Sequence, residues 1–152
     1  MPYGRLASMP ETTGSRSLRV VIADDDADTL VTLAAILQDE GHEVYGFGTG
    51  REALAAARMY RADVMIVDIQ MPDMTGYDIA RRVREHLADY PLVIAISGRW
   101  KGETDMLLSV AVGFDHHLMK PCDPGKLIEY LDEWSAEQDW RSGRDSNPRP
   151  PA

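Results

Sequence analysis

The feature that most constrains the fold is a repeated order along the chain. A short apolar run rich in β-branched residues is followed by an amphipathic segment, five times over. The apolar runs are residues 18–23, 42–47, 64–67, 92–96 and 114–119. Strands that alternate with helices form a parallel sheet with helices on both faces, linked by right-handed crossovers. The sequence therefore predicts an α/β fold, a doubly wound five-stranded parallel sheet with five helices.

The folded part of the chain is expected within residues 18–137. The length of 152 residues suits one domain with a sizeable core. Residues 1–17 are rich in Gly, Ser, Thr and Pro without an apolar period, which predicts a flexible leader. Residues 141–152 lack core-forming side chains, so a disordered tail is predicted over residues 138–152. The weakest predicted helix covers residues 101–112.

Composition narrows the class of protein. Hydrophobic residues make up 44% and charged residues 27% of the chain, as in globular proteins. The net charge of -9 argues against a binder of nucleic acid or anionic membranes, so we expect neither as a partner. The single Cys122 excludes an internal disulfide framework and favours a reduced, cytoplasmic location.

Charged and polar side chains follow four of the five predicted strands. The carboxyl ends of parallel strands meet at one edge of the sheet, where open α/β folds place their ligand chemistry. One acid would be enough to cap a helix, and three in succession repel each other, so they favour a divalent cation at this edge. The residues are Asp24, Asp25 and Asp26 after the first strand, Asp68 after the third, Ser97 after the fourth and Lys120 after the fifth.

The segment that follows Asp68 has the composition of a turn. Pro72 disfavours helix in the residue before it. Gly76 is expected to supply a positive φ before the next helix begins. Each polar residue at a strand end, taken singly, is more often a cap or a solvated surface residue. Their occurrence together at one edge of the sheet favours a functional site.

Together these features resemble the receiver domain of response regulators in two-component signalling. The resemblance covers about residues 18–134 and rests on four motifs: VVIADDD at 20–26, VDIQMPDMTG at 67–76, AISG at 95–98 and LMKP at 118–121. The run GFDHHLMKP at 113–121 is most similar to receivers of hybrid histidine kinases. The resemblance implies a flavodoxin-like fold of the receiver type, phosphorylation of an aspartate, and Mg²⁺ as the cofactor.

The resemblance also implies which residues bind the metal. Asp68 is the implied phospho-acceptor, and Asp25 and Asp68 are implied direct Mg²⁺ ligands together with the backbone carbonyl of Gln70. Asp24 would act through a coordinated water. Which two of the three successive acids take these positions is open by one residue, because Asp26 is also suited to cap the first helix.

Three further residues have implied roles around the phosphoryl group. Ser97 would bind one phosphoryl oxygen, and Lys120 would pair with another. The family has a cis bond between Lys120 and Pro121. His117 stands where family members usually have Tyr or Phe, three residues before the lysine. It is either a switch residue that turns inward when Ser97 engages the phosphate or an exposed histidine without that role.

We therefore expect a single-domain response regulator that takes a phosphoryl group from a phosphohistidine protein onto Asp68. It would not be an enzyme with a substrate of its own, although phosphorylation and dephosphorylation are expected to be self-catalysed. The expected partners are a sensor histidine kinase or histidine-phosphotransfer protein and a downstream protein at the fourth helix, fifth strand and fifth helix. The chain would be a monomer or weak dimer.

One alternative function stays open at this point, and a second, a phosphatase, is disfavoured by one residue. The chain could be a phosphorelay intermediate or a phosphate sink that passes the group to another histidine. An aspartyl phosphatase of the haloacid-dehalogenase type would need a second acid two residues after the nucleophile, and that position is Gln70.

Overall fold

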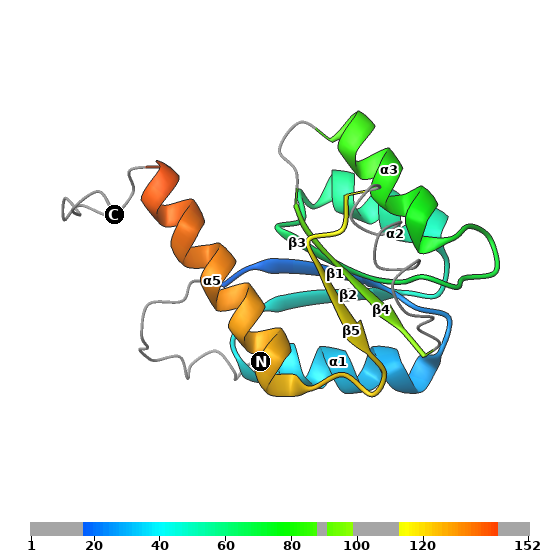
Figure 1. Ribbon diagram of the computed structural model, residues 1–152, viewed down its shortest axis with the longest axis horizontal. Coiled ribbons are helices and arrows are strands. Elements are labelled where there is room, and N and C mark those ends of the chain that lie inside the picture. The colour runs from blue at the N-terminus through cyan, green and yellow to red at the C-terminus, as the bar shows by residue number, and fades with distance from the viewer. Residues whose placement is uncertain (1–16, 88–90, 99–112, 143–152) are drawn as a thin grey trace.

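The computed structural model describes residues 17–87, 91–98 and 113–142 (Figure 1). Its strands all pair in parallel, in the order β2-β1-β3-β4-β5. The strands are β1 (Arg19–Ala23), β2 (Glu43–Phe47), β3 (Val64–Asp68), β4 (Leu92–Ser97) and β5 (His116–Met119). The helices are α1 (Ala27–Asp39), α2 (Gly50–Met59), α3 (Gly76–His86) and α5 (Pro124–Ser142). The predicted doubly wound α/β fold is confirmed, while the helix predicted over residues 101–112 lies outside the described residues.

Helices cover both faces of the sheet (Figure 1). Successive strand residues point to opposite faces, so Val20 and Ile22 face α1 and α5, whereas Val21 and Ala23 face α2 and α3. Two separate cores result, and the central strand β3 is buried along its whole length. The first core contains Leu33, Leu37, Leu127 and Leu131, and the second contains Ala53, Ala56, Ile79 and Val83.

Gly76 is needed for a different reason than the one predicted. It is the first residue of α3, and the described glycines with positive φ are Gly41 and Gly113 instead. A Cβ atom on Gly76 would lie 2.8 Å from the Cα of Ile69 and 2.9 Å from the carbonyl oxygen of Asp68. The start of α3 therefore rests directly on the backbone that follows the candidate phospho-acceptor, and only a residue without a side chain fits there.

The last helix is longer than predicted. α5 continues to Ser142 and so includes the first residues of the segment predicted as a disordered tail. Gln138 and Arg141 within this extension have good helix propensity, which is compatible with continuation of the helix. Residues 1–16 and 143–152 lie outside the described part, so the flexibility of both ends stays a prediction. None of the described helices combines the length and apolar character needed to cross a membrane.

Candidate functional site

The sheet brings the predicted polar residues to one edge. β1, β3, β4 and β5 are neighbours and parallel, so the residues at their carboxyl ends converge. Asp68 is the last residue of β3 and Ser97 the last of β4, while Asp24 and Lys120 immediately follow β1 and β5. The loop at Asp24 is fixed by its own N–H, which donates to the carbonyl of Phe47 at 3.0 Å.

Three carboxylates form the centre of this edge. One oxygen each of Asp24, Asp25 and Asp68 lies within 4.8 Å of the others. Asp24 and Asp68 are buried, and Asp25 is exposed. Asp26 turns away from the cluster and caps α1, because its side chain accepts hydrogen bonds from the Asp28 N–H and the Thr29 hydroxyl. The capping role left open for Asp26 is confirmed.

Lys120 joins two of these acids. Its Nζ atom lies 2.8 Å from Asp24 Oδ2 and 3.3 Å from Asp68 Oδ2. The Lys120 backbone is fixed by an N–H bond to the carbonyl of Ser97 at 3.0 Å, and its peptide bond to Pro121 is cis. Burial alone would lower the pKa of Lys120, but Asp24 and Asp68 outweigh it and the pKa is raised. The ammonium group therefore stays charged.

Asp68 is held by two donors in a buried position. Its Oδ1 accepts the Gln70 N–H at 3.1 Å, and Lys120 donates to its Oδ2. Burial raises the pKa of Asp68, and the neighbouring charge of Asp24 adds to that effect. The Gln70 N–H and Lys120 oppose the rise. A second cation would therefore help to keep Asp68 ionised.

The acid cluster fits a hard divalent cation. Oxygen donors are the ligands that Mg²⁺ prefers in proteins. Lys120 supplies one positive charge against three carboxylates whose oxygens converge, so charge remains to be balanced. Asp24, Asp25 and Asp68 are the residues that would hold the ion. Receivers typically bind Mg²⁺ in such an acidic pocket.

The two residues with an implied switch role lie on adjacent strands. Ser97 is only 3% exposed. His117 pairs in register with Ala95, two residues before Ser97, and its half-buried ring packs edge-on against Phe114 at 5.9 Å between centroids. Burial, and then neighbouring His116, lower the pKa of His117, which favours the neutral ring. Its role as a switch stays a prediction.

Sequence reasoning missed Asp73. Its carboxylate accepts the N–H groups of Gly50 and Arg51 at 2.9 and 3.0 Å, so it binds the start of α2 from within the loop that follows Asp68. The contact joins residues 22 and 23 positions apart, which no local pattern reveals. Thr75 begins α3 through a capping box with Asp78, and that short-range signal is readable in the sequence.

Comparison with known proteins shows that this chain is similar to response regulators and transcriptional regulators. The chain is 33% identical over 110 residues to the DNA-binding response regulator MtrA of Mycolicibacterium paratuberculosis, covering 72% of this chain and 48% of MtrA. It is 31% identical over 111 residues to the cell cycle transcriptional regulator CtrA of Caulobacter vibrioides, covering 73% and 47%. The chain thus spans about half the length of these curated relatives.

These relatives correct one expectation. Exclusion of nucleic acid as a partner was wrong for this class of protein, because MtrA is named as DNA-binding. The net charge of -9 counts only a stretch that corresponds to about half of such a regulator. An acidic receiver therefore does not argue against DNA contacts made by a regulator that contains it.

A solved structure and a family model settle the family. The receiver domain protein (CheY-like) of Methanospirillum hungatei JF-1 superposes with a TM-score of 0.74 at 30% identity, covering 82% of this chain and 98% of that one. The family model described as "Response regulator receiver domain" matches residues 20–132, which include every residue of the edge site. The chain belongs to the response regulator receiver family of two-component signalling.

Proposed function

We propose that Asp68 accepts a phosphoryl group from a phosphohistidine protein in a Mg²⁺-dependent reaction. The observation that carries the proposal is the pairing of buried Asp68 with Lys120 at 3.3 Å beside two further acids. A carboxylate oxygen of Asp68 attacks phosphorus, and the bond from phosphorus to the donor imidazole breaks. The imidazole then takes a proton from water. Hydrolysis of the aspartyl phosphate returns the carboxylate and inorganic phosphate.

The chain's own residues supply position and charge for this transfer. Phosphoryl transfer asks for alignment and charge stabilisation rather than covalent chemistry from the protein. Lys120 would pair with a phosphoryl oxygen, which its 3.3 Å contact with Asp68 supports, and Ser97, at the end of the neighbouring strand, would bind another. The ring of His117 would turn inward when Ser97 binds the phosphoryl group. Self-catalysed phosphorylation and dephosphorylation belong to the same proposal.

The hydrogen bond and ion pair that Asp24 already makes indicate which acids would bind the metal directly. Asp24 Oδ1 accepts the Asp26 N–H at 2.8 Å, and its Oδ2 lies next to Lys120. These contacts favour a contribution of Asp24 through a water. Asp25, which is exposed, and buried Asp68 would then bind Mg²⁺ directly, with the carbonyl of Gln70. An ion held by these residues would supply positive charge near the phosphoryl oxygens.

A protein donor has a surface to contact beside the site. A groove of ≈ 160 Å³ lies next to Lys120, between α1 and the segment that follows β5. The side chains that line it include Thr29, Leu33 and Cys122. Val31 on α1 is also 69% exposed. A histidine-phosphotransfer protein or kinase that docks here could bring its phosphohistidine to Asp68.

The test is chemical labelling. The purified chain is incubated with a small-molecule phosphodonor, with and without Mg²⁺, and its intact mass is measured. One added phosphate is expected with Mg²⁺, none without it, and none in Asp68→Asn. Asp73→Asn, an acid in the same loop that caps α2, should label as the parent does. Equal labelling of Asp68→Asn would refute the assignment of the acceptor.

The labelled protein from this assay also tests the relay alternative that the sequence left open. If the chain is a relay intermediate, a purified histidine-phosphotransfer protein should take the phosphoryl group from Asp68. The single-domain organisation and the cytoplasmic location stay predictions, since the chain spans about half of its curated relatives.

A further inference from the structure

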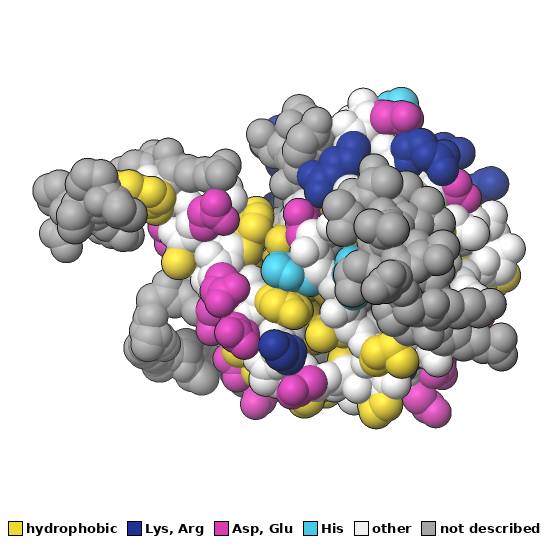
Figure 2. Space-filling view, in the orientation of Figure 1, with side chains coloured by type: hydrophobic (Ala, Val, Ile, Leu, Met, Phe, Trp, Pro, Cys, Tyr) yellow, Lys and Arg dark blue, Asp and Glu magenta, His cyan; other side chains and the backbone are white. Residues whose placement is uncertain are grey.

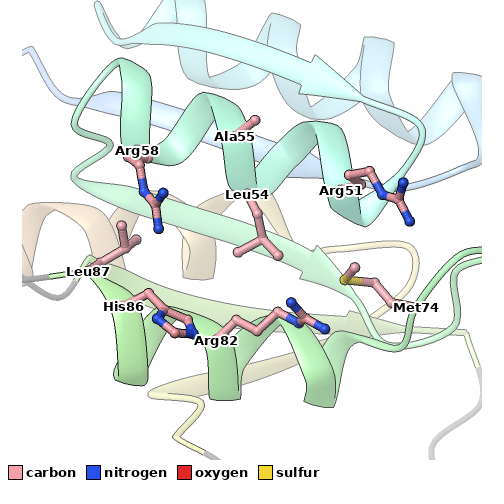
Figure 3. Close-up of a pocket in the computed structure, with 8 residues that line it drawn as sticks. All are labelled: Arg51, Leu54, Ala55, Arg58, Met74, Arg82, His86 and Leu87. Atoms are coloured by element: carbon pink, nitrogen blue, oxygen red, sulfur yellow. The ribbon is translucent and has the colours of Figure 1, made fainter.

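A groove between α2 and α3 lies apart from the phosphorylation site. Its volume is ≈ 360 Å³, and none of the edge-site residues lines it. Figure 3 shows the side chains of the two helices facing one another across it. Half-buried Leu54, Met74 and Leu87 line it with apolar side chains, and exposed Ala55 also lines it. The groove is thus a hollow with apolar side chains that the fold leaves open to solvent.

The rims of this groove are basic. Arg51 and Arg58 stand on α2, and Arg82 and His86 stand on α3. None of the described residues that line the groove is acidic, although the chain as a whole has a net charge of -9. Figure 2 shows the dark blue side chains gathered over the α3 end of the molecule, whereas acidic side chains line α5. The charge of the groove is therefore opposite to that of the rest of the chain.

The rim arginines differ from their neighbours on α3. Arg81 pairs with Asp78 at 3.1 Å, and Arg84 pairs with Asp115 at 3.4 Å. Within the part of the chain that the structure describes, Arg51, Arg58 and Arg82 make no such ion pair. Asp73 is the acid near Arg51, but its oxygens already accept the N–H groups that begin α2. His86 lies 3.7 Å from Glu85, so Arg58 and Arg82 are the rim residues best suited to pair with an external anion.

The side chains that line the groove limit which class of ligand can bind there. The described residues that line the groove include no Phe, Tyr or Trp on which a base could stack, and stacking is the main apolar contact of single-stranded nucleic acid. An occupant must instead bring apolar groups and a few negative charges together. Acidic residues that flank an apolar stripe do so in an amphipathic helix, which is a common groove ligand.

We propose that the α2–α3 groove docks an acidic amphipathic segment of a partner protein. Its apolar side chains lie over Leu54, Met74 and Leu87, and its carboxylates pair with the arginines of both rims. Arg51 and Arg58 are seven residues apart, about two helical turns or 10 Å along α2, so the contact spans about two turns of the occupant.

The test uses a defined probe, a fluorescent peptide of about four helical turns with leucines on one stripe and glutamates on both flanks. Anisotropy of the probe reports its binding to the whole chain. The double variant Arg58→Glu/Arg82→Glu should weaken binding about tenfold or more. The matched control is Arg81→Glu/Lys126→Glu, which changes the net charge equally at two exposed positions outside the groove. It should change binding by less than about threefold.

Two further comparisons test the apolar part. Ala55→Glu places a negative charge at an exposed position that lines the groove, and it should weaken binding as strongly as the double variant does. A probe with leucines replaced by serine should bind about tenfold more weakly. Circular dichroism of each variant confirms that it is folded, and amide NMR shifts should map the parent probe to α2 and α3.

Three results would overturn the proposal. The control variant could lose as much affinity as the groove variant, which would mean general charge attraction. The serine probe could bind as well as the leucine probe. An oligonucleotide or an anionic vesicle could bind more tightly than the peptide, with the same dependence on Arg58 and Arg82, which would assign the groove to that ligand instead.

Discussion

Lys120 lies closer to Asp24 than to Asp68, with its Nζ atom 2.8 Å from Asp24 Oδ2 and 3.3 Å from Asp68 Oδ2. Asp24 has no exposed surface, and this ammonium group is the cation next to it. The ammonium group thus stabilises the buried acid of the first strand while it remains within reach of the phospho-acceptor. A single lysine serves both the stability of the site and its proposed chemistry.

Removal of Lys120 should therefore destabilise the chain when no Mg²⁺ is present. Lys120→Met leaves Asp24 buried without its cation, and we expect a loss of about 2 kcal/mol, below the full cost of breaking a buried pair because Lys120 is partly exposed. Urea unfolding in the presence of a chelator measures the loss. Addition of Mg²⁺ should reduce it, since an ion that binds the native state stabilises that state.

The control for that variant is Lys126→Met, which removes an exposed lysine from α5. Its free energy of unfolding should stay within about 0.5 kcal/mol of the parent. If Lys120→Met were as stable as this control in the chelator, Asp24 would not depend on the lysine.

The close approach of Gly76 to Ile69 gives a second prediction. The Cβ atom of Gly76→Ala would lie 2.8 Å from a backbone atom that cannot move aside. We expect this substitution to destabilise the chain by about 1–3 kcal/mol, as overpacking does. Gly48→Ala is the matched control, because nothing lies within 4 Å of a Cβ atom there. Thermal unfolding of both variants checks the difference, and equal melting temperatures would contradict it.

Gly76 also illustrates what the sequence could and could not predict. The strands, their order in the chain and the polar residues at their ends follow from local patterns, and the predicted edge site lies where the structure has it. The reason for Gly76 depends on a close approach between the β3 backbone and α3, which local composition does not contain. The Asp73 cap on α2 and the basic rims of the α2–α3 groove likewise join separate segments of the chain.

Asp73 provides a prediction about pH. The N–H of Gly50 is the main cause that lowers the pKa of Asp73 in the folded chain. The unfolded chain, with a reference pKa of about 3.9, therefore binds the proton first as pH falls. The stability that Asp73 contributes is complete above that value and is lost as pH falls through the lower folded pKa.

The measurement compares the parent with Asp73→Ala by urea unfolding at two pH values. The variant should be less stable at about pH 7, and the difference should shrink at about pH 3. Asp73→Asn keeps an oxygen that can accept one N–H but does not titrate, so its deficit should change less between the two pH values. A difference from Asp73→Ala that stays constant with pH would show that the carboxylate charge does not matter.

His42 provides the prediction at milder pH. The residue is 7% exposed, and its Nδ1 atom accepts the N–H of Leu18 at 3.1 Å, so the ring is neutral with its proton on Nε2. Burial lowers the pKa of His42, and the opposing charges of Asp132 and Asp63 do not compensate. Protonation would place a second proton on Nδ1, break the bond from Leu18 and leave a charge in the core beneath α1 and α5.

The sign of the pH effect follows from these contacts. An unfolded histidine has a pKa of about 6.5, so below that value the unfolded chain takes up a proton that the folded chain refuses. Stability should be constant with respect to His42 above about pH 7.5 and should fall as pH drops from about 6.5 toward the lowered folded pKa.

His42→Asn offers an amide oxygen to Leu18 without a titrating group. It should show a smaller loss of stability between about pH 7.5 and 5.5. His117→Tyr is the comparison, because the pKa of His117 is also lowered by burial. If His42→Asn kept the full pH dependence of the parent while His117→Tyr removed it, the buried bond to Leu18 would not be the source.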